Sequence, residues 1–188
     1  ITAHNETAHP TFGYENVYDF YNNEFNGVSG IGIHLNGLIA GNSIGQPYIH
    51  QCYFHGRQVG KDYPAIRIDD GCQPIISDCG FESVKHCIVS NHTLGMVIKG
   101  NQLASQKSAI VINTTSAGSH VPNVGLIVIG NLINAGNDEV ANTSSAIYQI
   151  ATSKSGPRLE EAIVSSNVFS MACDWCPQYV INLTSNYC

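Results

Sequence analysis

Short apolar runs along the chain follow two recurring patterns. In the first, an apolar residue stands three positions before a central Asn or Cys, and another stands two positions after it, as in "ISDCGF" and "IKGNQL". The central residues are Asn23, Asn42, Cys52, Cys79, Asn101, Asn131 and Asn167. The second pattern lies between these runs, as "GIGIHL", "AIRID", "CIVSN", "AIVINT", "AIYQI" and "YVINLT". Alternating runs of four to six residues rich in Ile and Val predict strands.

The spacing of these strands predicts a repeat of about 22 residues. Cys79 lies 22 residues before Asn101, and Cys87 lies 22 residues before Ala109, while later repeats are longer. Two or three short strands per repeat of this length predict an all-β fold, a single-stranded parallel β-helix (solenoid) of about six coils. We expect two inward columns of side chains: Ile49, Ile76, Ile98, Val128 and Val164 in one, and Phe54, Phe81, Leu103, Ile133 and Phe169 in the other.

The central Asn has a physical role in such a repeat. Asn tolerates the left-handed backbone conformation, so we expect it to bend the chain sharply between two strands. Gly41, Gly100 and Gly130 precede the bend and supply a small residue at a tight corner. Stacked Asn side chains can also form hydrogen bonds between successive coils.

A β-sandwich or jelly roll is the alternative all-β fold. It predicts antiparallel hairpins, and the "NG" pairs at Asn26 and Asn36 and the "DG" pair at Asp70 suit tight hairpin turns. A sandwich does not explain the recurring corner, so the sequence favours the β-helix.

The alternation of "AIVI"-type and "IxxNxF"-type strands resembles the right-handed β-helices of the pectate-lyase-like superfamily. Within that superfamily, the irregular coils most resemble bacteriophage tailspike and tail-fibre proteins. The resemblance implies a right-handed helix, an extended polysaccharide such as a bacterial capsule or O-antigen as partner, a homotrimer, and an extracellular or virion location. We expect an N-terminal cap or inter-chain segment at 1–19, the β-helix at 20–184 and a short tail at 185–188.

Composition agrees with this class of protein and excludes others. Apolar residues make up 43% of the chain and charged residues only 12%, which disfavours long helices built from Ala, Leu, Glu and Lys. With a net charge of −6 and only eight Lys and Arg, we expect no nucleic-acid partner. No apolar run is long enough to span a membrane. The chain begins at Ile1 without a signal peptide, which favours a mature product or an excised fragment.

Seven cysteines leave at least one unpaired within the chain. We expect buried free thiols at Cys52, Cys79 and Cys87. "CDWC" with Cys188 lacks a second CxxC pair or His residues at ligand spacing, so the sequence predicts no metal site and no cofactor. A disulfide among Cys173, Cys176 and Cys188 remains an alternative in an extracellular protein.

Four carboxylates fall within 14 residues, at Asp69, Asp70, Asp78 and Glu82. If Ile66 and Ile68 point inward, Asp69 points outward and could pair with Asp78 or Glu82. Glycoside hydrolysis needs one protonated acid and one base or nucleophile, so these four are the candidate catalytic residues. Crowding of like charges would raise the pKa of one of them, which suits an acid. A turn at "DDG", backbone capping by Asp78 and a cation site are the alternatives.

A second group of residues suits the binding of an acidic sugar. A lyase needs a cation to neutralise a uronate carboxylate, and a base that is often Lys, Arg, His or Tyr. The candidate substrate-binding residues are Arg67, His50, Tyr53, His55, Arg57 and Lys99. His50, Ser77 and Lys99 are expected in one outward column, and aromatic rings could stack on sugars. A solvated loop with amphipathic side chains is the alternative.

We therefore expect an extracellular module that recognises and depolymerises a polysaccharide, as a glycoside hydrolase or polysaccharide lyase. Two alternatives stay open: a non-catalytic glycan-binding or structural β-helix of a virion fibre, and a secreted microbial or fungal polysaccharide lyase or hydrolase.

Overall fold

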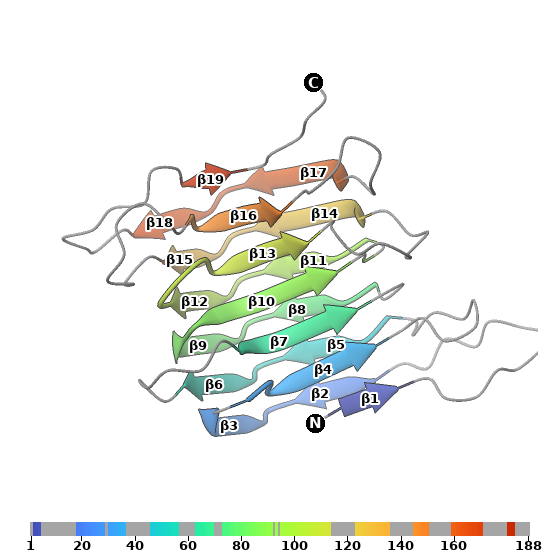
Figure 1. Ribbon diagram of the computed structural model, residues 1–188, viewed down its shortest axis with the longest axis vertical. Helices are drawn as coiled ribbons and strands as arrows, with labels where there is room; N and C mark the ends of the chain where they lie inside the picture. The colour runs from blue at the N-terminus through green and yellow to red at the C-terminus, as the bar shows by residue number, and fades with distance from the viewer. Residues whose placement is uncertain are drawn as a thin grey trace, which may run out of the picture.

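Every described strand pairs in parallel with its neighbours in one of three sheets (Figure 1). The computed structural model describes residues 2–4, 18–28, 30–36, 46–56, 63–69, 73–91, 93, 95–113, 123–135, 145–150, 159–170 and 180–182. Within these residues there are strands and no helix. The prediction of an all-β protein with parallel strands is confirmed for this part of the chain. The sandwich alternative is wrong here, because Asn26 lies inside a parallel strand and Asn36 ends one.

The chain passes through sheets A, B and C in the same order throughout, and one such passage is called a coil below. Sheet A consists of β1 (Thr2–His4), β4 (Ile33–Asn36), β7 (Pro64–Asp69), β10 (His86–Asn91), β13 (Ile110–Asn113), β16 (Ile147–Ile150) and β19 (Ile181–Asn182). Sheet B consists of β2 (Asp19–Tyr21), β5 (Tyr48–His50), β8 (Ile75–Ser77), β11 (Val97–Lys99), β14 (Asn123–Ile129) and β17 (Leu159–Ser165). Sheet C consists of β3 (Glu24–Val28), β6 (Tyr53–Gly56), β9 (Gly80–Val84), β12 (Gln102–Ser105), β15 (Leu132–Asn134) and β18 (Val168–Ser170).

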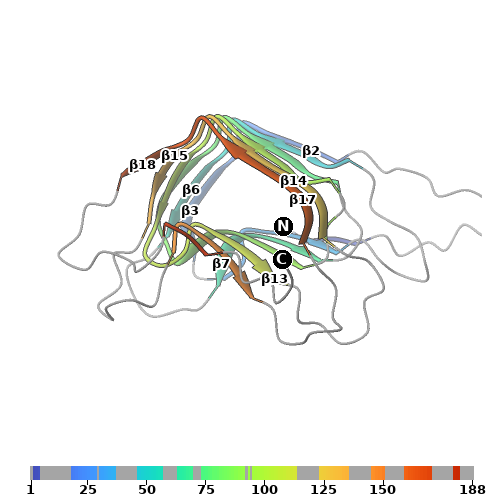
Figure 2. The same ribbon diagram turned by 90° about the horizontal axis from the view of Figure 1, so that it is seen from above.

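The two sequence patterns map directly onto these sheets. The second pattern supplies the strands of sheet A, and the first supplies a sheet B strand, a tight corner and a sheet C strand. Viewed from above, the three sheets surround the interior, and the corner between sheets B and C lies opposite sheet A (Figure 2). This arrangement is consistent with a solenoid. Asn42 and Gly41, which the pattern also places at a corner, lie outside the described residues.

Both predicted inward columns are confirmed by the strand register. Ile49, Ile76, Ile98 and Val128 pair in succession and are fully buried, and Val164 is partly buried at the end of the column. The second column runs through Phe54, Phe81, Leu103, Ile133 and Phe169. Fully burying one such side chain contributes about 1.5–3 kcal/mol, so these columns supply much of the stabilisation between coils.

Aromatic stacking strengthens the first coils of the second column. Phe25, Phe54 and Phe81 lie face to face, with ring centroids 4.6 and 4.8 Å apart and nearly parallel planes. The separation matches the spacing between parallel strands, so the register itself sets the stacking distance.

The bend at the corner between sheets B and C is made by the residue before the central Asn or Cys. The residues with positive φ at this corner are Asn22, Gln51, Asp78, Gly100, Gly130 and Ser166, with φ between 52° and 67°. The prediction that the central Asn adopts the left-handed conformation is therefore wrong by one position. Gly100 and Gly130 themselves adopt the left-handed conformation that makes the bend, in addition to being small residues at a tight corner.

The central Asn instead forms a hydrogen-bonded ladder, as predicted. Asn101 Nδ2 donates to Asn131 Oδ1 over 3.0 Å, and Asn131 Nδ2 donates to Asn167 Oδ1 over 2.9 Å. Each Asn also donates to the carbonyl of the inward residue in the previous coil, at Ile76, Ile98 and Val128 respectively. Asn131 and Asn101 are almost completely buried, so the ladder satisfies backbone groups that water does not reach.

Two thiols occupy the same position in earlier coils. Cys52 Sγ donates to the carbonyl of Phe20 and Cys79 Sγ to that of Ile49, which are the same carbonyl positions that the Asn side chains use later. Cys52, Cys79 and Cys87 are buried and free, which confirms the expectation for these three. The side-chain interaction with Cys52, together with burial, raises the pKa of Cys79, and burial raises that of Cys87, so both remain protonated thiols.

Candidate functional site

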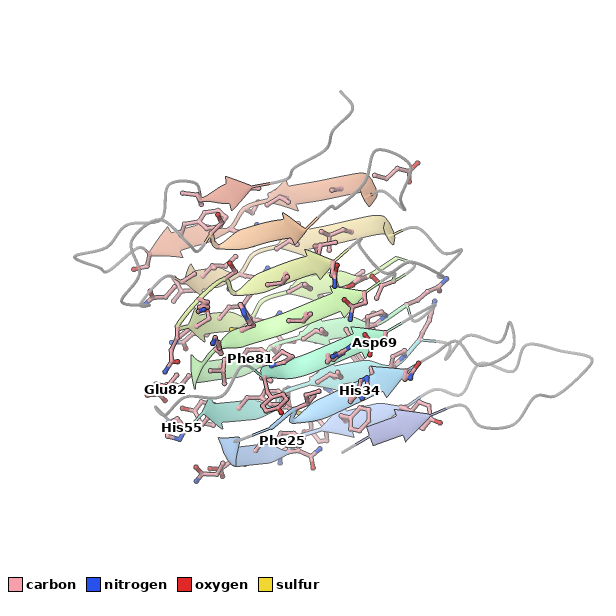
Figure 3. All side chains as sticks on the ribbon, in the orientation of Figure 1. Phe25, His34, His55, Asp69, Phe81 and Glu82 are labelled. Atoms are coloured by element: carbon pink, nitrogen blue, oxygen red, sulfur yellow. The ribbon has the colours of Figure 1, made fainter. Side chains whose placement is uncertain are left out.

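A group of polar side chains lies on the outer face of sheet A. Strand alternation buries Ile66 and Ile68, so Arg67 and Asp69 lie on the opposite face, as predicted. The register then places His34 of β4 beside Arg67, and Asn91 of β10 beside Asp69. Figure 3 shows His34 and Asp69 close together on neighbouring strands. We call these four residues the sheet A cluster.

Asp69 is the centre of this cluster. His34 Nε2 donates to Asp69 Oδ2 over 2.6 Å, and Arg67 Nε lies 2.9 and 3.1 Å from the two carboxylate oxygens. Asn91 Nδ2 also donates to Asp69 Oδ1. Only 8% of Asp69 is exposed, so the carboxylate is held by three donors in a site that water barely reaches.

This environment lowers the pKa of Asp69. Burial by itself raises the pKa, but hydrogen bonds from Asn91, His34 and Arg67, together with the charge of Arg67, outweigh burial. The expectation that like-charge crowding makes one carboxylate a protonated acid is wrong for Asp69, because its neighbours are donors and a cation. Asp69 is an ionised residue that positions His34 and Arg67.

Arg67 has hydrogen-bond donors that are not bonded to Asp69. Its Nε faces Asp69, its side chain is 43% exposed, and no described residue forms a hydrogen bond with its two terminal amino groups. Asn91 Oδ1 is a buried acceptor without a hydrogen-bond partner in the described part of the chain. The cluster therefore offers a fixed cation through the exposed end of Arg67, while Asn91 Oδ1 is buried from solvent.

A second group of polar side chains lies on the outer face of sheet C. Tyr53 donates from its hydroxyl to Glu82 Oε2, and the register places His55 beside Glu82 and Asn26 beside His55. His55 Nδ1 lies 3.4 Å from Asn26 Oδ1. The structure thus brings together three of the residues expected from sequence, Tyr53, His55 and Glu82, which we call the sheet C cluster. Hydrogen bonding to Glu82, some desolvation and nearby negative charge raise the pKa of Tyr53.

The outer face of sheet B carries the predicted column of His50, Ser77 and Lys99, and the register confirms its alignment. The His50 ring stacks against Tyr21 and Tyr48, with centroids 4.7 and 4.2 Å away, and its Nε2 lies 2.9 Å from Asp19 Oδ1. Ser77 is fully buried and Lys99 is exposed. The faces of the His50 ring are thus already occupied by protein.

The candidate catalytic carboxylates do not share one face. Asp69 ends a sheet A strand, Asp78 is an exposed corner residue between sheets B and C, and Glu82 points outward from sheet C. Figure 2 shows sheet A and this corner on opposite sides of the interior, and Figure 3 shows Asp69 and Glu82 on different sides of the molecule. Asp70 and Arg57 lie outside the described residues.

Among the described residues, no group of His, Cys, Asp and Glu is arranged to bind a metal ion. The same residues include no helix that is long and apolar enough to cross a membrane. The "CDWC" cysteines Cys173 and Cys176, together with Cys188, fall outside them.

Sequence reasoning missed His34 and Asn91. The signal was present, because aligning "GIGIHL", "AIRID" and "CIVSN" strand by strand places His34 beside Arg67, and Asn91 beside Asp69.

Comparisons with known proteins supply no further assignment for this site. No family model matches the chain, and neither a curated protein nor a solved structure matches it.

Proposed function

We propose that this protein is an extracellular, polysaccharide-recognising and depolymerising module, in which the outer face of sheet A binds an acidic sugar. The observation that carries the proposal is the exposed guanidinium of Arg67, which Asp69 holds by its Nε. Two parallel N–H groups in a fixed fork are suited to a carboxylate, as in a uronate residue.

The fold supports a ligand of this kind. Parallel strands repeat every 4.8 Å or so, which produces ladders of outward side chains alongside which an extended polymer can lie. We propose a single right-handed parallel β-helix of about six coils, like those of the pectate-lyase-like superfamily and of phage tailspikes. Parallel crossovers within one sheet are right-handed in nearly all known proteins, which supports the handedness.

Elimination suits this face better than hydrolysis by two carboxylates. Hydrolysis needs an acid and a base about 5–9.5 Å apart across one sugar, whereas the described carboxylates Asp69 and Glu82 lie on different sheets. Elimination needs a cation that neutralises the uronate carboxylate and a base that removes a proton. The neighbours of Asp69 include one residue of each kind, Arg67 and His34. The alternative function, binding without cleavage, is favoured by the full engagement of the Asp69 carboxylate with protein donors.

A homotrimer is part of the proposal, and the exterior of the last coils supports an assembly. Exposed apolar side chains gather on both sides of the corner between sheets B and C: Ile129 and Ile163 on sheet B, and Leu132 and Val168 on sheet C. Contiguous exposed apolar residues commonly mark a protein interface. A virion fibre or a secreted enzyme is the setting in which such an assembly would meet bacterial capsule or O-antigen.

The test is an assay of purified protein against acidic and neutral capsular polysaccharides and O-antigens. Unsaturated uronates absorb in the ultraviolet, so absorbance and reducing ends measured together distinguish elimination from hydrolysis. We expect ultraviolet-absorbing products from an acidic polymer, at least tenfold less with Arg67→Ala, and no change with Lys107→Ala, a cation outside the sheet A strands.

Each other result has a defined meaning. Retained binding of an acidic polymer without any product would support the non-catalytic alternative. Equal binding and cleavage by wild type and Arg67→Ala would show that the sheet A face is not the site.

A further inference from the structure

The ring of Tyr53 is fixed on the outer face of sheet C. It crosses from β6 toward β9 above Gly80, where any Cβ would come within 2.8 Å of the ring atom Cδ2. Its hydroxyl donates to Glu82 beyond the glycine, yet 39% of Tyr53 is exposed. The ring is thus supported along one edge and bonded at its tip, while part of its surface stays open to solvent.

Such a ring suits the apolar face of a sugar. An aromatic ring binds the C–H face of a pyranose by dispersion and by burial of apolar area. Because Gly80 and Glu82 already hold the ring in place, a ligand would not have to order it, and that preorganisation favours binding.

Polar groups next to the ring suit the hydroxyls of the same sugar. The second oxygen of the Glu82 carboxylate and the Nε2 of His55 have no hydrogen-bond partner in the described part of the chain. Asn26 continues the row in the previous coil. A carboxylate, an imidazole and an amide therefore lie in one column beside the ring, and they can both donate to and accept from hydroxyl groups.

The negative charge around the Tyr53 ring determines which class of sugar can bind there. Glu24 pairs with Tyr53 in the register and Glu82 lies on the other side of the ring, and both contribute negative charge there. The strands of sheet C contain no Lys or Arg. A uronate or other anionic sugar would be repelled at this place, whereas a neutral sugar would not.

We propose that Tyr53, Glu82 and His55 form a second glycan subsite that takes a neutral pyranose, separate from the acidic-sugar site on sheet A. The inference rests on the proposed recognition of polysaccharides and adds a second surface with the opposite charge preference. A polymer with alternating acidic and neutral sugars, or two polymer strands, could use both faces.

The experiment measures affinity by calorimetry for neutral oligosaccharides (fragments of dextran, mannan and neutral O-antigen) and for acidic capsular oligosaccharides. We expect Tyr53→Ala to weaken neutral binding by about tenfold, in line with the value of an aromatic contact, and to leave acidic binding unchanged. Gly80→Ala keeps the tyrosine but forces the ring to move, so we expect a similar loss. The matched control is Tyr63→Ala, which removes another exposed tyrosine at the start of a sheet A strand.

The outcomes separate the two proposals. The sheet C subsite alone is overturned if Tyr53→Ala and Gly80→Ala bind neutral oligosaccharides as tightly as wild type does. It is also overturned if the wild type binds acidic oligosaccharides but no neutral ones. Loss of affinity for neutral sugars in Tyr63→Ala to the same extent also overturns it. Absence of binding to every probe overturns the subsite and removes the support for the proposed function as well.

Discussion

The outer faces of sheets A and C carry carboxylates in contrasting environments. On sheet A, Asp69 is 8% exposed and is surrounded by Arg67, His34 and Asn91, which lower its pKa. On sheet C, Glu82 is exposed and accepts from Tyr53, whose pKa rises. The same strand geometry thus produces a tightly bonded ion pair on one face and an exposed acidic site on the other. The difference comes from burial and from the residues that the register places next to each carboxylate.

The largest expected difference between the two faces is in stability. Asp69→Ala leaves His34, Arg67 and Asn91 without their shared acceptor, so we expect the free energy of unfolding to fall by about 2–4 kcal/mol. Glu82→Ala removes one exposed hydrogen bond and should cost less than about 1 kcal/mol. Urea unfolding of both variants, followed by circular dichroism, measures the contrast. Equal losses would contradict the view that the sheet A cluster is the more tightly integrated of the two.

Acid should unfold the protein partly through Asp69. Because the pKa of Asp69 is lower in the folded protein than its ordinary value of 3.8, its contribution to stability is complete above that value. The contribution is lost as the pH falls below about 3.8 through the folded pKa, when the carboxylate is protonated. Urea unfolding at pH 6, 4 and 2.5 should show a shallower acid loss for Asp69→Asn than for wild type. If the acid-induced loss of stability became shallower in Glu82→Gln and stayed as in wild type in Asp69→Asn, the acid-sensitive group would lie on sheet C and not on sheet A.

Salt should distinguish binding to the two faces. Acidic-sugar binding at Arg67 depends on charge, so raising NaCl from 0.05 to 0.5 M should weaken it by several-fold. Neutral-sugar binding at Tyr53 depends on contact with the ring and should change little over the same range. Calorimetric titrations at both salt concentrations provide the comparison, and equal salt dependence would argue against two sites of opposite character.

The smallest expected effect is on the titration of Tyr53. Its pKa lies above the ordinary 10.0 because its hydroxyl donates to the ionised Glu82. Glu82→Gln removes that charge, and we expect the pKa of Tyr53 to move back toward 10.0, as followed by the ring signals in NMR. Tyr63, which is also exposed, serves as the internal reference. An unmoved Tyr53 signal would mean that Glu82 does not determine this titration.

The core of the fold was accessible from the sequence because periodicity expresses it directly. Columns such as Ile49–Ile76–Ile98 follow from a repeat in which one apolar side chain per strand must point inward. The stacked Asn ladder was likewise predicted from the recurrence of Asn101 and Asn131 at one position. The backbone bend was placed one residue too late, because Asn and the residue before it both suit left-handed geometry, and only the dihedral angles distinguish them.

The candidate site was only partly accessible. Arg67 and Asp69 were selected for their chemistry, yet of the proposed partners of Asp69, Asp78 lies at the corner between sheets B and C and Glu82 lies on sheet C. Nearness in sequence was misleading because the corners and loops of each coil redirect the chain to a different face. Of the three donors that hold Asp69, only Arg67 is near it in sequence, whereas His34 and Asn91 lie 35 and 22 residues away along the chain.

The sequence by itself determined that the protein is built from parallel strands, which side chains are buried, and which position carries the corner ladder. These properties depend on local alternation and on a repeat length, and both can be read along a single strand. Tertiary structure decided which polar residues meet, since that depends on the register between coils separated by loops of unequal length. It also decided the surroundings of each carboxylate, because burial and hydrogen-bond donors come from neighbours that are distant in the chain.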